Sequence, residues 1–167
     1  MSGSFDISGL KKLQSDLQKL EKEAPKTCQK CSDELAARLL RLVKQKTLPG
    51  KKPELDDSLS KKQRKVAEEI WDGYVGGELR RGWTVQKGIN SGGTYVNFVI
   101  NPVKYGPYVE YGHYQQRGRY VPALGKSLTK SWVKGSFMLI KSLQDLEKIA
   151  PNVIQKNVDA MMKEVFG

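Results

Sequence analysis

A Cys-x-x-Cys pair, Cys28 and Cys31, is the arrangement in this chain that most resembles a chemical motif. A redox pair of this kind needs a strand before it and a helix that opens at the first cysteine. The residues before Cys28 are instead charged and helix-forming. A tetrahedral zinc site needs four ligands, and the sequence adds one histidine, His113, far along the chain. We therefore expect both cysteines to pack as small apolar side chains on a helix, without metal or cofactor.

Three other arrangements fall short of an active site. His113 lies in a glycine-rich segment expected to be a loop, and no neighbouring nucleophile and carboxylate complete a catalytic set around it. Gly125-Lys126-Ser127 resembles the end of a phosphate-binding loop, but Tyr120 replaces the first glycine of that pattern. Glu68 and Glu69 are adjacent, so on a helix they point to different sides. We expect a protein that is not an enzyme.

The composition indicates a globular chain with an anionic partner. The 167 residues include 29 Lys and Arg against 18 Asp and Glu, which gives a formal net charge of +11. A charge of this size favours binding to nucleic acid, a membrane surface or an acidic protein. The N-terminal residues lack the pattern of a signal peptide, and no apolar run is long enough to span a bilayer. The expectation is a soluble protein in a reducing cytoplasm, with no membrane contact.

The positive charge is concentrated in two segments. Residues 44–65 hold eight basic and three acidic residues, and residues 112–141 hold six basic residues and no acidic one. Both segments read as loops, so their cations are candidates for contact with DNA or with an acidic partner. The candidate contact residues are Lys51, Lys52, Lys61, Lys62, Arg64, Lys65, Arg117 and Arg119.

Apolar periodicity predicts long amphipathic helices at both ends. Leu10, Leu13, Leu17 and Leu20 recur at spacings of three and four residues, the pattern of one helix face. Asp6 or Ser8 can cap this helix, Pro25 is placed to begin a second helical piece, and the helix should end near Thr47. A similar apolar face predicts a C-terminal helix over 138–166, which Pro151 should kink or restart.

One phrase occurs near both prolines. LEKEAPKTCQK starts at Leu20 and LEKIAPNVIQK starts at Leu146. Each copy is interpreted as a joint between two helical pieces. Two joints of similar composition, or an internal duplication, would both produce this likeness.

The middle of the chain predicts a β-hairpin. Trp83 to Val85 and Tyr95 to Ile100 are rich in β-branched and aromatic residues, and the turn residues 90–93 lie between them. The fold class is therefore α+β, with a small antiparallel sheet packed against long amphipathic helices in a single domain. Its predicted parts are N-terminal helices (1–47), a basic connector (48–65), a helix and the hairpin (66–112), a basic loop (113–137) and the C-terminal helix (138–166).

Two phrases flank this hairpin and combine aromatic residues with arginine, as protein interfaces do. Gly77 to Trp83 precede it, and Tyr105 to Gly112 follow it. A tight turn anchored on the sheet by aromatic residues is the alternative interpretation of the second phrase. The candidate interface residues are Leu79, Arg80, Tyr105, Tyr108, Val109, Glu110, Tyr111 and Gly112.

These phrases resemble the neck or tail-completion proteins of long-tailed bacteriophages, which are also described as minor tail components. The family opens with a helix start, here Phe5 to Leu10. A Gly-x-Leu-Arg phrase, here Gly77 to Arg80, leads into a hairpin. A Tyr-Ala-Pro-Tyr-x-Glu-x-Gly phrase follows, here Tyr105 to Gly112 with Gly106 in place of alanine, and a long helix ends the chain. The order and spacing of these parts match over most of the chain.

The resemblance implies a structural virion protein, present in the host cytoplasm during assembly. It would form a ring at the head–tail junction that joins capsid to tail and lets DNA pass. Six copies would match the symmetry of a tail and are favoured over twelve, which would match a portal. The implied partners are a head-closure or connector ring, a tail terminator or tail tube, and, transiently, packaged DNA. The free protein is expected to be a monomer because a ring of such basic chains would repel itself.

A basic nucleic-acid-binding protein without catalytic activity is the alternative function. Tyr114, Tyr120 and Trp132 are interleaved with basic residues and have the chemistry to stack on bases. The sequence carries no recognised DNA-reading motif. An enzyme acting on DNA or on the cell wall is a third class, which lacks a carboxylate or metal arrangement to support it.

Overall fold

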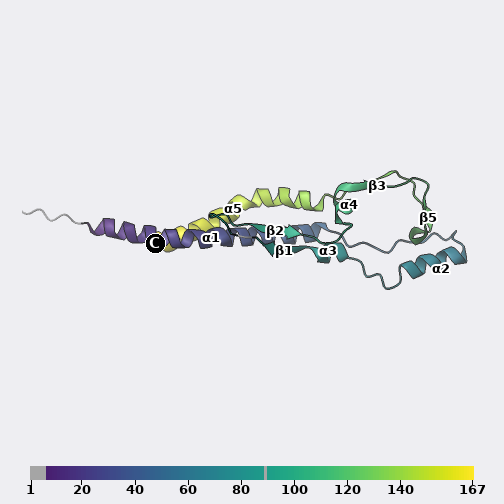
Figure 1. Ribbon diagram of the computed structural model, residues 1–167, viewed down its shortest axis with the longest axis horizontal. Coiled ribbons are helices and arrows are strands. Elements are labelled where there is room, and N and C mark those ends of the chain that lie inside the picture. The colour runs from purple at the N-terminus through teal and green to yellow at the C-terminus, as the bar shows by residue number, and fades with distance from the viewer. Residues whose placement is uncertain (1–6, 89) are drawn as a thin grey trace, which may run out of the picture. The chain divides into compact units, whose positions relative to one another are not determined.

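The structure is a computed structural model that describes residues 7–88 and 90–167 (Figure 1). It confirms the α+β class, with long helices at both ends of the described chain and small antiparallel sheets. The helices are α1 (Ser8–Lys46), α2 (Lys61–Ile70), α3 (Glu78–Gly82), α4 (Gly106–Tyr111) and α5 (Met138–Phe166). The strands are β1 (Thr84–Lys87), β2 (Asn97–Ile100), β3 (Gly112–Tyr114), β4 (Tyr120–Val121), β5 (Lys126–Ser127) and β6 (Trp132–Lys134), and η1 (Pro122–Leu124) is a 3-10 turn.

The chain forms two compact units, and each takes segments from distant parts of the sequence. Unit 1 comprises Met1–Arg41, Val85–Val99 and Leu143–Gly167, and unit 2 comprises Leu42–Thr84 and Ile100–Ser142. Within the described residues, no helix is long and apolar enough to cross a membrane. Residues Phe5 and Asp6, named above in the family opening and as a helix cap, lie outside the described part of the chain.

Both long helices run through their prolines without interruption. The predicted second start at Pro25 is wrong, because α1 is one helix from Ser8 to Lys46. Pro151 likewise lies inside a continuous α5, so a restart there is also excluded. Both prolines are exposed, and the carbonyl groups that each ring leaves without an amide partner belong to the exposed residues Glu21 and Glu147. Water can satisfy these carbonyls, which keeps the cost of each proline low enough for a long helix to bear.

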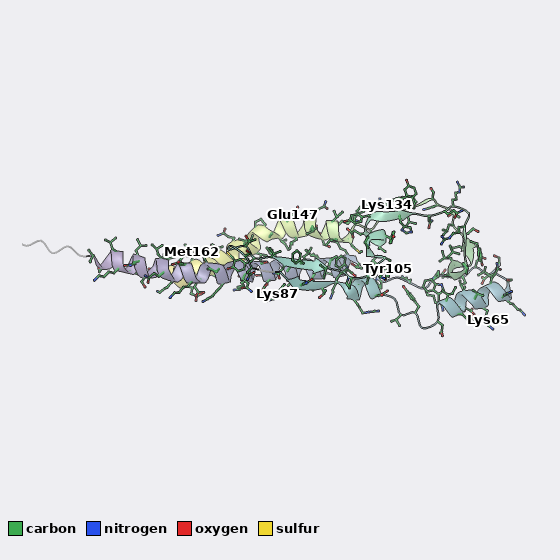
Figure 2. All side chains as sticks on the ribbon, in the orientation of Figure 1. Lys65, Lys87, Tyr105, Lys134, Glu147 and Met162 are labelled. Atoms are coloured by element: carbon green, nitrogen blue, oxygen red, sulfur yellow. The ribbon has the colours of Figure 1, made fainter. Side chains whose placement is uncertain are left out.

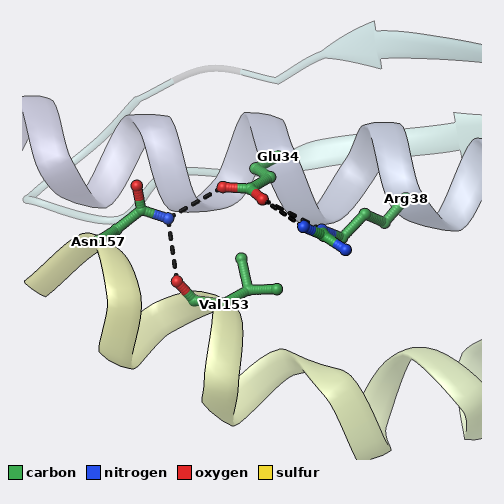
Figure 3. Close-up of polar contacts among 4 residues, drawn as sticks. All are labelled: Glu34, Arg38, Val153 and Asn157. Atoms are coloured by element: carbon green, nitrogen blue, oxygen red, sulfur yellow. Dashed lines mark hydrogen bonds and ion pairs between the residues drawn. The ribbon is translucent and has the colours of Figure 1, made fainter.

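A polar link joins α1 to α5 inside unit 1 (Figure 3). The Asn157 amide donates to Glu34 Oε2 at 3.0 Å and to the Val153 carbonyl at 2.9 Å. Arg38, one turn along α1, donates to the other Glu34 oxygen at 2.7 Å. The Asn157 bond, followed by the Arg38 bond, lowers the pKa of Glu34 below its ordinary value. Asn157 and Val153 are both buried, so this link is part of the unit 1 core.

Replacing Asn157 with alanine should lower the stability of the chain by about 1–2 kcal/mol near neutral pH, because the Glu34 carboxylate and the Val153 carbonyl lose their donor. The folded pKa of Glu34 is depressed, so its contribution is present above the unfolded pKa and is lost as pH falls through the folded pKa. The difference in free energy of unfolding between wild type and Asn157→Ala should therefore become smaller below about pH 4. Urea denaturation at neutral and acidic pH measures this gap. Gln155→Ala, in the same helix with an exposed bond to Asp159, is the control, and a gap independent of pH would contradict the role of Glu34.

The predicted hairpin is confirmed, and β1 pairs with β2. Ser91 and Thr94 exchange two backbone hydrogen bonds, of 3.3 and 3.0 Å, across a two-residue turn. Gly92 and Gly93 form this turn with φ of 56° and 80°, which glycine adopts without steric cost and which hairpin turns require. On α1, Ser32 donates to the Tyr95 carbonyl at 3.3 Å. The turn and this bond hold β2 beside α1 in unit 1.

The first helix after the connector begins earlier than predicted. The sequence analysis placed the start of this helix at residue 66, but α2 runs from Lys61 to Ile70. Ser60 forms a capping box in which its side chain accepts from the Gln63 amide and the Gln63 side chain accepts from the Ser60 amide. This reciprocal capping fixes the start of a helix. The basic connector is therefore shorter than the predicted 48–65, and four of its candidate cations lie on α2.

The predicted basic loop 113–137 is also wrong, because four short strands occupy it. Strands β3 and β6 pair antiparallel, with Tyr114 opposite Trp132. Strands β4 and β5 pair in the same way, with Tyr120 opposite Ser127. These two pairs, connected through residues 115–119 and 128–131, form one ribbon in unit 2. We call residues 112–134 the ribbon. The aromatic and β-branched residues of this segment fit strands, but its glycines favoured a loop.

Candidate functional site

Within the Tyr105–Gly112 phrase, residues Gly106–Tyr111 form the short helix α4 rather than the tight turn of the alternative interpretation. Its residues divide into two sets. Tyr108, Val109 and Tyr111 are exposed, at 59%, 38% and 56%. Gly106 and Glu110 are buried. The phrase therefore presents an apolar, tyrosine-rich surface on one side and is anchored in unit 2 by the other.

Glu110 is fixed by the first turn of α5. Its carboxylate accepts from the Leu139 amide at 3.0 and 3.2 Å and from the Ile140 amide at 3.1 Å. These amides have no partner within the helix, and the positive end of the helix dipole favours a carboxylate there. Only 5% of Glu110 is exposed. This candidate interface residue therefore has a structural task inside its own chain.

Gly112 also has a structural task. Its φ is 87°, and a Cβ at this position would lie 2.4 Å from the Val133 carbonyl oxygen and 2.8 Å from the Gly135 amide nitrogen. Only glycine allows this approach of α4 to β6. The final residue of the tyrosine phrase is thus explained by the backbone geometry that starts the ribbon.

The Gly-x-Leu-Arg phrase, residues 77–80, contacts the start of α4. Leu79 on α3 is buried and would contact any side chain added at Gly106. The Tyr105 hydroxyl donates to Glu78 Oε2 at 3.1 Å. Burial, followed by this bond to Glu78, raises the pKa of Tyr105. Arg80 is exposed, so of the candidates on α3 only Arg80 is available to a partner.

The ribbon adds aromatic residues that the candidate interface set did not include. The Tyr114 and Trp132 rings stack edge to face at 4.8 Å, and 82% and 44% of these residues are exposed. His113 lies on β3, not in a loop, and its ring meets Tyr108 at 6.0 Å. The predicted loop concealed this register. The signal for it was a pair of aromatic and β-branched stretches, residues 113–114 and 132–133, bounded by glycines.

Unit 2 brings the two basic segments together through a hydrogen bond between residues that are 52 positions apart in sequence. The Trp71 indole, just after α2, donates to the Ala123 carbonyl in η1 at 2.6 Å, and α2 packs against η1. Figure 2 shows Lys65 on α2 and Lys134 on β6 as side chains directed outward. Arg64 is partly used within the chain, because it bonds Asp57 at 3.2 Å. The remaining candidate cations are exposed, namely Lys51, Lys52, Lys61, Lys62, Lys65, Arg117 and Arg119.

The cysteines are not packed as predicted. Cys28 is exposed and Cys31 is half-buried, and both are free thiols. Cys31 lines an open groove of about 400 Å³ in unit 1 together with Leu35, Tyr95 and Ile154. Burial raises the pKa of the Cys31 thiol, which reduces the reactive thiolate. Among the described residues, no cluster of three or more His, Cys, Asp or Glu side chains could hold a metal ion.

The comparison with protein families assigns the chain to a class. The family model described as "Bacteriophage HK97-gp10, putative tail-component" matches residues 11–112. The chain belongs to this HK97-gp10-like family. The match confirms the resemblance to tailed-phage proteins and runs from the first turns of α1 to Gly112, the end of the tyrosine phrase. Comparisons with curated proteins and with solved structures gave no match. HK97-gp10-like proteins are structural tail components, so this chain is a structural protein of a phage tail.

Proposed function

We propose that this HK97-gp10-like protein forms a ring at the head–tail junction, where it joins capsid to tail and lets DNA pass. Six copies are proposed, to match the symmetry of a tail. The single observation that supports this proposal is a surface of unit 2 formed by α4 and the ribbon. The tyrosines of α4 are exposed there, and the ribbon adds exposed aromatic and basic residues. Aromatic and arginine side chains on such surfaces are typical of protein interfaces.

The charge of the chain supports assembly on a partner. Each copy carries +11, and a ring of six such copies would repel itself unless an anionic neighbour neutralised it. An acidic connector or tail-terminator ring, or DNA in the channel, would supply that neutralisation. The free protein is then a monomer at low salt, which light scattering measures. Stable rings of the isolated protein at low salt would count against this assembly route.

Charge reversal on the ribbon tests the proposed junction. Phage particles in which Arg117→Glu and Arg119→Glu replace the native residues should contain mostly separate heads and tails, with a roughly tenfold loss of joined particles. The control variant is Lys148→Glu, which reverses an exposed charge on α5. Electron microscopy counts joined particles, and circular dichroism of the purified variants checks that each one folds. Normal joining by the folded ribbon variant would contradict the proposal.

Nucleic-acid binding is the second candidate, favoured by the exposed Tyr114–Trp132 pair next to basic residues. Stacking of bases on this pair would give strong binding to single strands that weakens steeply with salt. The junction protein would instead bind DNA weakly at physiological salt. Fluorescence titration with a single-stranded oligonucleotide at two salt concentrations separates the two functions, and tight binding at physiological salt would favour the second.

A further inference from the structure

The first turns of α1 carry an apolar face that the described residues leave largely uncovered. Leu10, Leu13 and Leu17 are 66%, 50% and 51% exposed. Their spacing places them along one side of the helix. An exposed apolar face of a few hundred Å² on a soluble protein usually marks an interaction site. This leucine face, Leu10 to Leu20, therefore calls for a partner.

The charges of α1 are segregated around the leucine face. Asp16, Glu21 and Glu23 each lie three or four residues from one of the four leucines, so they flank the face. No lysine lies three or four residues from any of these leucines. The lysines of this segment consequently point away from the face. They are Lys11, Lys12, Lys19, Lys22 and Lys26.

The acidic residues beside the leucine face indicate which kind of surface can bind to it. A second leucine face would bring its own Glu21 and Glu23 against the first pair, and like charges in direct contact destabilise a pairing. Asp16 is buried, with 6% exposed, so Glu21 and Glu23 are the acids of this set that can meet a partner. Glu23 has a lysine partner on its own helix at 2.6 Å, but a pair at the surface is weak. The face is thus suited to an apolar surface that carries positive charge.

The ribbon has this chemistry. Tyr114, Trp132 and Lys134 share one face of the β3–β6 pair, because Tyr114 is opposite Trp132 and Lys134 is two residues further along the same strand. Tyr114 and Trp132 are exposed, and residues 112–134 contain five basic residues and no acidic one. A stripe of three helical turns is about 16 Å long, and the three-residue strands β3 and β6 match about 10 Å of that length.

We propose that the leucine face of one copy docks on the Tyr114–Trp132 face of the next copy. Such a contact is heterologous, with a different surface on each side, and repeated contacts of this kind form a ring when the rotation between neighbouring copies closes. The proposal rests on the proposed ring and identifies its subunit contact. A single contact of this size lies at the weak end of protein interfaces, so it holds only when several contacts act together on a partner.

Disulfide trapping tests the contact in the full chain. In a Cys28→Ser, Cys31→Ser background, one protein carries Leu17→Cys and a second carries Trp132→Cys. Oxidation of the mixture should give a disulfide-linked dimer that a reductant cleaves back to monomers. Each protein alone should stay monomeric. One chain carrying both substitutions should give a ladder of multimers. The matched control is Lys22→Cys, on the opposite side of α1, which should not cross-link with Trp132→Cys.

Charge exchange gives a second readout. Glu21→Lys in the first protein should slow the cross-linking about threefold, as should Lys134→Glu in the second, and the two together should restore the rate. Dimers of the Leu17→Cys protein alone would show that two leucine faces meet. If the doubly substituted chain forms an internal disulfide and stays monomeric, the contact lies within one chain. Either result, or no cross-link at all, overturns the docking proposal. Joined particles observed despite such a result would leave the junction function standing.

Discussion

Replacing Glu110 with alanine is expected to lower the stability of the folded chain by about 2–3 kcal/mol. The reason is that its buried carboxylate accepts from the amides of both Leu139 and Ile140, and hydrogen bonds to a charged group at a helix start are among the stronger ones. The substitution leaves these two amides without their side-chain acceptor. The first turn of α5 should then fray.

Urea denaturation measures the loss of stability, and hydrogen exchange at the amides of residues 139 and 140 locates it. Glu110→Gln keeps an acceptor oxygen without the charge and should lose roughly half as much. Glu147→Ala removes an exposed carboxylate from the same helix and should change stability by less than about 0.5 kcal/mol. Unchanged exchange at residues 139 and 140 in Glu110→Ala would contradict the capping role.

A larger loss, about 3–5 kcal/mol, is expected for Trp83→Ala, since truncating a buried aromatic side chain leaves a cavity. Trp83 is only 6% exposed, and Val43 and Met138 are also buried in the core of unit 2. The Trp83 indole donates to Thr47 Oγ1 at 2.9 Å, and Thr47 donates to the Val43 carbonyl at 2.6 Å. The tryptophan thus contributes both its volume and one buried hydrogen bond.

Two variants divide these contributions. Trp83→Phe fills most of the volume but cannot donate to Thr47, so it should lose about 1–2 kcal/mol. Trp132→Ala removes an exposed tryptophan of the ribbon and should change stability by less than about 1 kcal/mol. Thermal and urea denaturation of the three variants give the comparison. Equal losses for Trp83→Ala and Trp132→Ala would show that Trp83 is not a core residue.

The sequence predicted the elements that depend on local pattern. The apolar face of 138–166 and the turn residues 90–93 specified α5 and the hairpin, because periodicity and glycine turns act over a few residues. The prolines were misjudged. A proline signals a break, but exposed prolines in helices of this length cost too little to end them.

Features set by contacts between distant residues were not predictable. The pairing of Tyr114 with Trp132 depends on a register across the ribbon, and glycines in the segment suggested a loop instead. The role of Glu110 depends on α5, which begins twenty-eight residues later. Cys28 follows the apolar side of α1 in sequence, yet it is exposed. The interface candidates on α4 could be proposed from composition. Which of them are exposed and which are buried in their own chain could not be predicted.

The exposed and buried residues of the tyrosine phrase have different tasks: the exposed ones are available to a partner, and the buried ones stabilise the fold. Tyr108 and Tyr111 point outward, while Glu110 and Gly112 serve the chain itself. A phage lineage that acquires a different neighbour can exchange the outward side chains with little penalty to the scaffold. The inward positions have no such freedom, so related phages should keep the same glutamate and glycine while the residue at position 111, between them, varies with the binding partner.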